Sequence, residues 1–168
     1  LTLLAAVLVL RAAGPGAGSA SPFHVGGTAG TDELTLPDRD LLYRLLPGAD
    51  FLGYYRVSPR GWRGDDDVTD APADGVTRIV CTGDSTTFGL GVREDKAWPA
   101  VLQRLLDVLF DGAQRFEVIN AGVPGYSTWQ NRLQIEGELL GLAPDVVAWH
   151  VSGYNDASGT RSLSDAEA

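Results

Sequence analysis

The chain has 168 residues, with 13 basic and 22 acidic side chains, which gives a formal net charge of -9. Hydrophobic residues make up 44% and charged residues 21%, proportions that are ordinary for a globular protein and exclude a disordered chain or a fibrous repeat. The acidic balance argues against a nucleic-acid partner, because the phosphate backbone requires a basic surface. The single cysteine, Cys81, excludes an intramolecular disulfide and a multi-cysteine metal site.

The first segment has the composition of a targeting or anchoring sequence. Residues 1–10 (LTLLAAVLVL) are apolar and precede Arg11, but a helix that spans a bilayer needs about 20 apolar residues. The run is typical of the apolar part of a signal peptide, or of an anchor whose upstream portion is missing. We therefore expect residues 1–22 to be a signal peptide or membrane anchor with a linker, and the protein to be exported or tethered to a membrane. A buried helix of a soluble domain is the alternative.

Residues 23–76 form a lead segment rich in loop-forming residues. Two helical turns are predicted at residues 40–46 (DLLYRLL), where Pro47 ends them. The aromatic, β-prone residues 51–58 (FLGYYRVS) predict a strand or an extended arm. The acidic run at residues 65–67 lacks the ligand spacing of a calcium-binding EF-hand loop and is interpreted as a solvated turn.

From residue 77 onward, short apolar strands alternate with helices. Strands are predicted at residues 78–82, 116–120 and 145–151, and apolar residues recur at helical spacing between them. This alternation is typical of βαβ units. We therefore predict that residues 77–168 form a three-layer α/β/α domain with a parallel, flavodoxin-like sheet.

A cluster of glycine and polar residues follows each predicted strand: residues 83–85 (GDS), 121–125 (AGVPG) and 152–156 (SGYND). In a parallel sheet the carboxyl ends of the strands share one edge, and ligands bind there. Three clusters that are distant in the sequence are therefore expected to form one site.

The residue types in these clusters suit acyl transfer. Ser85 can act as a nucleophile once a general base removes its proton. The oxyanion formed by attack on a carbonyl needs fixed donors, and the candidates are the backbone N–H groups of Ser85 and Gly125 and the side-chain amide of Asn155. This chemistry requires no metal and no organic cofactor, and we expect none.

The three clusters resemble the first three sequence blocks of the SGNH hydrolases, also called GDSL-type esterases and lipases. In that family the nucleophile is the serine of a G-D-S motif, here Ser85, and the second block contributes a glycine N–H. Gly125 is the most natural match to that glycine, and Gly122 is a competitor. The third block has the form G-x-N-D, here residues 153–156.

The resemblance covers residues 78–156 and implies an ester hydrolase or acyltransferase that works through an acyl-enzyme on Ser85. The exported relatives it suggests act on carbohydrate O-acyl esters or lipid-like esters, and the sequence does not choose between these substrates. The alternative, from another functional class, is a catalytically inactive envelope binding module that keeps the fold.

The sequence departs from the family at the fourth block, which has the form D-x-x-H and supplies the base. The residue three positions before His24 is Ser21, and the residue three positions before His150 is Val147. We therefore expect the chain to be an N-terminal fragment, inactive alone, whose catalytic histidine and aspartate lie beyond residue 168. A degenerate, inactive relative is the alternative.

Simpler structural roles also account for several of these residues. Ser85 could only cap the following helix, and Asp84 is expected to brace the turn by hydrogen bonds instead of acting as an acid or base. His150 and Cys81 lie within predicted strands and are expected to be core residues. Core packing is likewise expected of Trp98, Trp129 and Trp149.

Overall fold

The structure is a computed structural model that describes residues 34–51, 53–64, 68–151 and 153–157. The predicted signal peptide or anchor at residues 1–22 and the acidic run at residues 65–67 lie outside the described residues. Within the described ranges, no helix has the length and apolar character that crossing a membrane would require.

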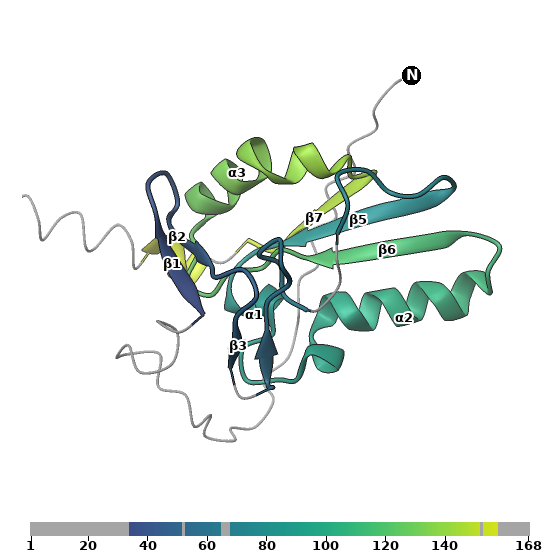
Figure 1. Ribbon diagram of the computed structural model, residues 1–168, viewed down its shortest axis with the longest axis horizontal. Helices are drawn as coiled ribbons and strands as arrows, with labels where there is room; N and C mark the ends of the chain where they lie inside the picture. The colour runs from purple at the N-terminus through teal and green to yellow at the C-terminus, as the bar shows by residue number, and fades with distance from the viewer. Residues whose placement is uncertain (1–33, 52, 65–67, 152, 158–168) are drawn as a thin grey trace, which may run out of the picture.

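The centre of the fold is a parallel sheet of three strands, in the order β6-β5-β7 (Figure 1). The strands are β5 (Val76–Thr82), β6 (Arg115–Asn120) and β7 (Val146–Trp149). Cys81 of β5 lies opposite Asn120 on one side and Ala148 on the other. All three strands therefore end near the same edge, and the prediction of three parallel strands is confirmed.

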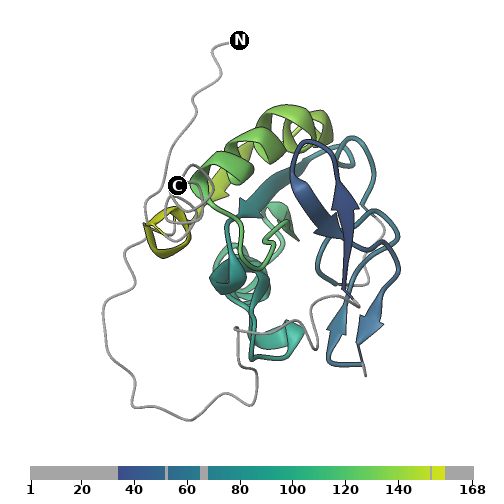
Figure 2. The same ribbon diagram turned by 90° about the vertical axis from the view of Figure 1, so that its left-hand side faces the viewer.

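The two long helices cover opposite faces of this sheet. Helix α2 (Trp98–Phe110) connects β5 to β6, and α3 (Thr128–Gly137) connects β6 to β7. Because β6 and β7 lie on opposite sides of β5, right-handed crossovers must place the two helices on opposite faces. Figures 1 and 2 show this arrangement, which confirms the predicted α/β fold with a parallel sheet.

Shorter helices also belong to the described part of the sheet domain. They are α1 (Ser85–Phe88), which begins directly after β5, and the 3₁₀ helices η1 (Glu94–Lys96) and η2 (Leu139–Leu142).

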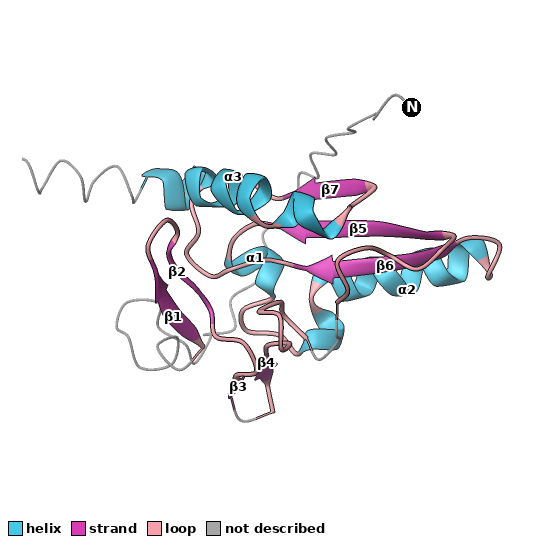
Figure 3. Ribbon diagram, turned by 45° about the horizontal axis from the view of Figure 1, so that its top comes forward, coloured by secondary structure: helices cyan, strands magenta, loops and turns pink. Residues whose placement is uncertain are grey.

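The lead segment forms two antiparallel hairpins near the carboxyl ends of the sheet strands (Figure 3). Their strands are β1 (Thr35–Asp38), β2 (Leu42–Leu45), β3 (Asp50–Phe51) and β4 (Tyr55–Arg56). The extended arm predicted for residues 51–58 is thus the second hairpin, in which β3 and β4 enclose a tight turn.

The prediction of helical turns at residues 40–46 was wrong, because this segment forms the turn and the second strand of the first hairpin. The Asp38 carboxylate accepts hydrogen bonds from the N–H groups of Asp40 and Leu41, each at 2.9 Å. Leu42 then takes a φ of 69°, a left-handed conformation that interrupts a helix. The local turn and the pairing with β1 outweigh the helix propensity of the leucines.

The hairpins and the loops after β5 and β6 share one hydrophobic core. Its buried members come from both parts of the chain: Leu34, Leu41, Leu45, Tyr55, Val57, Phe88, Val123 and Tyr126. The backbone N–H of Arg63 also donates to the carbonyl of Asn120 at 3.0 Å. The lead segment therefore braces the loops that carry the candidate site residues.

Candidate active site

Ser85 stands on a sharp turn between β5 and α1. The N-cap of α1 is Asp84, whose Oδ1 accepts from the backbone N–H of Thr86 at 2.8 Å. Ser85 is the first residue of the helix and is partly exposed. Its role is therefore not that of the helix cap, and the prediction that Asp84 braces the turn is confirmed.

The Ser85 side chain is available for chemistry. Among the described residues, no group makes a hydrogen bond to its Oγ or accepts one from its backbone N–H. A hydroxyl and an N–H on one residue, neither of which has a partner in the described ranges, suit a nucleophile that also contributes an oxyanion donor.

The loop after β6 contains two glycines with different surroundings. The N–H of Gly122 donates to Oδ1 of Asn120 at 3.1 Å, and a Cβ at Gly122 would lie 2.3 Å from the N atom of Phe88. Gly122 therefore serves close packing against α1. Gly125 is exposed, and no described group accepts a hydrogen bond from its N–H. Of the two, Gly125 has the N–H that could bind a ligand.

The third cluster reaches the first two through Asn155, which lies in a helical stretch at residues 153–157. Its Nδ2 donates to the carbonyl oxygen of Tyr126 at 2.9 Å and to Oδ2 of Asp84 at 3.3 Å. One amide group thus contacts the turn after β5 and the loop after β6. The predicted convergence of the three clusters is confirmed by these contacts.

Asp156 fixes the same cluster to the start of α3. Its Oδ1 accepts from the N–H of Thr128 at 2.6 Å and its Oδ2 accepts from the hydroxyl of that residue at 2.5 Å. A carboxylate at a helix N-terminus also interacts favourably with the helix dipole. Asp156 is the last residue of the G-x-N-D pattern, but no local sequence signal indicates that it pairs with Thr128.

His150 is not the core residue that its strand position predicted. Its side chain is 29% exposed, and its Nδ1 lies 3.5 Å from Oδ1 of Asp84. The Nδ1 atom is buried and makes no hydrogen bond of good geometry in the described structure. The ring lies beside the active-site turn because β7 ends at Trp149, one residue before it.

Cys81 is a core residue, as predicted. It is fully buried within β5, and burial raises the pKa of its thiol to about 12. The neutral thiol is a weak nucleophile, so this cysteine does not compete with Ser85.

The prediction that Trp129 packs in the core was wrong, since the residue is 58% exposed. The fully buried residues of α3 are polar: Gln130, Asn131 and Gln134. Leu133 and Ile135 are only partly buried and pack against the hydrophobic clusters beside them. Gln134, for example, donates to the carbonyl of Ala121 at 3.1 Å. Helix α3 therefore uses side-chain amides to hold the loops, and its aromatic residue is left on the outer face.

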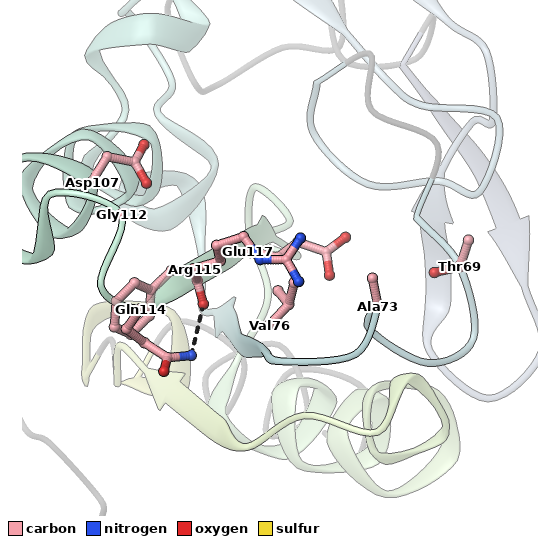
Figure 4. Close-up of a pocket in the computed structure, with 9 residues that line it drawn as sticks. Thr69, Ala73, Val76, Asp107, Gly112, Gln114, Arg115 and Glu117 are labelled. Carbon is pink, nitrogen blue, oxygen red and sulfur yellow. Dashed lines mark hydrogen bonds between the residues drawn. The ribbon is translucent and has the colours of Figure 1, made fainter.

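A cavity of about 610 Å³ lies at the opposite edge of the sheet (Figure 4). Its lining includes Val76 and Arg115, the first residues of β5 and β6. Because the strands are parallel, this cavity is separated from Ser85 by the length of β5. It does not belong to the candidate active site.

No group of three or more histidine, cysteine or acidic side chains in the described ranges is arranged to hold a metal ion. The candidate site consists of a hydroxyl, backbone N–H groups, a side-chain amide and a carboxylate.

The fold and the site together define a doubly wound α/β domain with a serine-centred polar site at the carboxyl edge of its sheet. The model of the GDSL-like Lipase/Acylhydrolase family matches residues 81–168, just over half of the chain. The chain therefore belongs to the GDSL-like lipase and acylhydrolase family. No curated protein matches it.

Proposed function

We propose that this protein is an ester hydrolase or acyltransferase that forms an acyl-enzyme on Ser85. The observation that carries the proposal is the 3.3 Å contact between Asn155 Nδ2 and Asp84 Oδ2. This contact brings the third cluster to the turn on which Ser85 stands. Membership of an acylhydrolase family supports the same class of reaction.

The proposed reaction begins when Ser85 Oγ attacks the ester carbonyl carbon. A carbon–oxygen bond forms, the hydroxyl proton passes to a general base, and the carbonyl oxygen becomes an oxyanion. Collapse of this intermediate expels the alcohol, which takes up the proton. Water or an acceptor alcohol then attacks the acyl group by the same steps in reverse order and frees Ser85.

The oxyanion donors are the backbone N–H groups of Ser85 and Gly125 and the side-chain amide of Asn155. The two backbone groups support this assignment because they have no partner among the described residues. Both hydrogens of Asn155 Nδ2 are engaged, at 2.9 and 3.3 Å. In the transition state, the longer contact to Asp84 exchanges for the oxyanion, while the bond to Tyr126 holds the amide in place.

The general base is proposed to come from a D-x-x-H block downstream of residue 168, as the family resemblance implies. His150 lies against Asp84, and His24 lies outside the described residues. Neither histidine has an aspartate three residues before it.

The test is labelling with a fluorophosphonate, a probe that reacts with activated serines, on protein expressed from the complete gene. The wild type should be labelled and Ser85→Ala should not. Ser127→Ala is the matched control, since Ser127 caps α3 and its loss should leave labelling intact. Equal labelling of the wild type and Ser85→Ala would reject Ser85 as the nucleophile.

The substrate is proposed to be a carbohydrate O-acyl ester or a lipid-like ester. Hydrolysis of p-nitrophenyl esters of increasing acyl length, compared with deacetylation of acetylated glycans, separates these two classes. An intact, folded protein that binds glycans but neither reacts with the probe nor hydrolyses any ester would instead be the non-catalytic binding module.

We also propose that the protein acts outside the cytoplasm, because the apolar run at residues 1–10 and the Gly/Ala-rich stretch that follows suit export or anchoring. Fractionation of cells that express the native gene should place the protein in membrane, envelope or secreted fractions. Recovery from the cytosol alone would reject this location.

A further inference from the structure

The first hairpin of the lead segment, formed by β1 and β2, contacts the peptide group that carries the Gly125 N–H, one of the proposed oxyanion donors. Tyr43 lies in β2, and its hydroxyl donates a hydrogen bond to the carbonyl oxygen of Pro124 at 2.9 Å. That carbonyl belongs to the same peptide group as the N–H of Gly125. The contact joins residues 81 positions apart in the sequence.

A trans peptide group is planar, and its C=O and N–H bonds point in opposite directions. No cis peptide bond occurs in the described residues. When Tyr43 fixes the Pro124 carbonyl, it therefore also directs the N–H of Gly125 away from the hairpin. A rotated peptide would present a carbonyl oxygen in place of a donor, and an oxyanion would then be repelled.

Steric contact reinforces this hydrogen bond. A Cβ at Gly125 would lie 2.5 Å from the Tyr43 hydroxyl oxygen, and the φ of Gly125 is 84°. The hydroxyl thus touches the backbone of this loop, and only glycine adopts the conformation without strain. The loop cannot carry a larger residue while Tyr43 keeps its place.

Tyr43 is itself held by the segment that it positions. The hydroxyl of Tyr126 donates to the backbone carbonyl of Tyr43 at 2.6 Å, and the two rings meet edge to face at a centroid distance of 5.4 Å. In addition, Gln130 Nε2 donates to the carbonyl of Leu41 at 2.8 Å. These reciprocal contacts make the hairpin and the Gly125 loop one rigid unit.

We propose that Tyr43 is a positioning residue for the reaction: its hydroxyl, bonded to Pro124, orients the Gly125 N–H toward the oxyanion. The proposal rests on the function proposed for Ser85 and gives the lead segment a part in that function. Burial raises the pKa of the Tyr43 phenol, so the group remains a donor at neutral pH.

The first test compares Tyr43→Phe with Tyr54→Phe in protein expressed from the complete gene. Tyr54 is the matched control, because its hydroxyl also donates to a backbone carbonyl, but that carbonyl belongs to Gly91, at 3.1 Å, and not to the loop that contains Gly125. Tyr43→Phe should lower kcat about tenfold with KM within about twofold. This loss is smaller than that for removal of a donor, because the N–H remains but is less well oriented.

Two further measurements separate positioning from a loss of fold. Tyr43→Phe should weaken binding of a boronic acid that mimics the tetrahedral intermediate, while binding of a ground-state product analogue stays unchanged. Thermal melts should show both variants folded at the assay temperature. An unchanged kcat and boronate affinity in Tyr43→Phe, or an equal loss in Tyr54→Phe, would overturn the proposal.

A second variant keeps the test decisive if Tyr43→Phe does not fold. Incorporation of 3,5-difluorotyrosine at position 43 keeps the ring and the hydroxyl but lowers the phenol pKa. The kcat should then fall at alkaline pH where the wild type stays active, because a phenolate cannot donate to Pro124. Asp38, Arg44 and Tyr126 are the nearby titratable groups, and they are the same in both proteins. Identical pH profiles would overturn the proposal.

If Ser85→Ala remains active and labelled, the proposed function fails. If Ser85→Ala is inactive while Tyr43→Phe matches the wild type, only the inference about Tyr43 fails. The two outcomes are therefore distinguishable.

Discussion

Asp84 makes more contacts within the candidate site than Ser85, the residue beside it. One carboxylate oxygen caps α1 and lies near His150, and the other accepts from Asn155. A buried carboxylate with partners on both oxygens orients the groups around it. Asp84 therefore both caps the turn that carries Ser85 and holds the side-chain amide of Asn155 in place.

Substitutions at Asn155 test the role of the side-chain amide. Asn155→Ala should lower kcat by about 10²- to 10³-fold with a smaller change in KM, as expected for a donor that acts in the transition state. Asn155→Asp should be at least as harmful, because a carboxylate repels the oxyanion. Steady-state kinetics on a p-nitrophenyl ester provide the measurement, and an unchanged kcat in either variant would remove Asn155 from the oxyanion site.

Substitutions at Asp84 separate its structural role from its charge. Asp84→Ala removes the N-cap of α1 and should lower the free energy of unfolding by about 1 kcal/mol. Asp84→Asn should cost less, since asparagine caps helices well. Urea denaturation of both variants measures the difference. Equal stabilities for Asp84→Ala and the wild type would show that the cap contributes nothing.

Among the elements of the fold, the strands of the sheet and the extended character of residues 51–58 could be predicted from the sequence, but the first hairpin could not. The β-branched runs that form β5, β6 and β7 are bounded by glycine and polar residues, and this is a local signal. Residues 40–46 have helical propensity, but the Asp38 turn and pairing with β1 decide their structure. The inward residues of helix α3 were also predicted poorly, because its fully buried side chains are amides, and Gln130 and Gln134 donate to backbone carbonyls of distant loops.

The buried side chain of Arg78 holds the amino-terminal half of β5 to its surroundings. It is 0% exposed, its Nε donates to Glu117 at 2.7 Å, and its Nη1 donates to the carbonyls of Thr69 and Leu142 at 2.8 and 2.5 Å. Glu117 is partly exposed and can be hydrated, but removal of the buried guanidinium also leaves the carbonyls of Thr69 and Leu142 without this donor.

Arg78→Ala should therefore lower the free energy of unfolding by about 3 kcal/mol. Arg132→Ala is the matched control, since Arg132 forms an exposed pair with Glu136 one helical turn away, and such pairs contribute about 0.5 kcal/mol or less. Denaturant unfolding of both variants provides the comparison. Similar losses in the two proteins would contradict the structural role given to Arg78.

In the molecule as a whole, the location of the candidate site could be predicted, but the contacts that hold its loops in place could not. Ser85, Gly125 and Asn155 follow strands of a parallel sheet, so their convergence follows from topology alone. The contacts of Tyr43, Asp156 and His150 depend on which loops meet in space, and no local pattern encodes that. The sequence also left Gly122 and Gly125 as alternatives, because their difference in burial and in the partners of their N–H groups depends on the folded structure.

The 168-residue chain alone should have no meaningful esterase activity. A base must lie within about 2.6–3.2 Å of the serine hydroxyl, and among the described residues no side chain makes a hydrogen bond to Ser85 Oγ. The proposed oxyanion donors alone would give only residual acceleration. Hydrolysis of p-nitrophenyl acetate by this chain and by the product of the complete gene tests the point. Equal turnover by both, abolished by His150→Ala, would instead identify His150 as the base.

Trapping the acyl-enzyme tests most directly whether the reaction proceeds through Ser85. Protein from the complete gene is mixed with p-nitrophenyl acetate, quenched in acid during turnover and analysed by mass spectrometry. We expect one acetyl group per chain, mapped by peptide sequencing to Ser85 and absent from Ser85→Ala. An active enzyme that carries no acetyl group, or carries it on another residue, would show that the reaction does not proceed through an acyl-enzyme on Ser85.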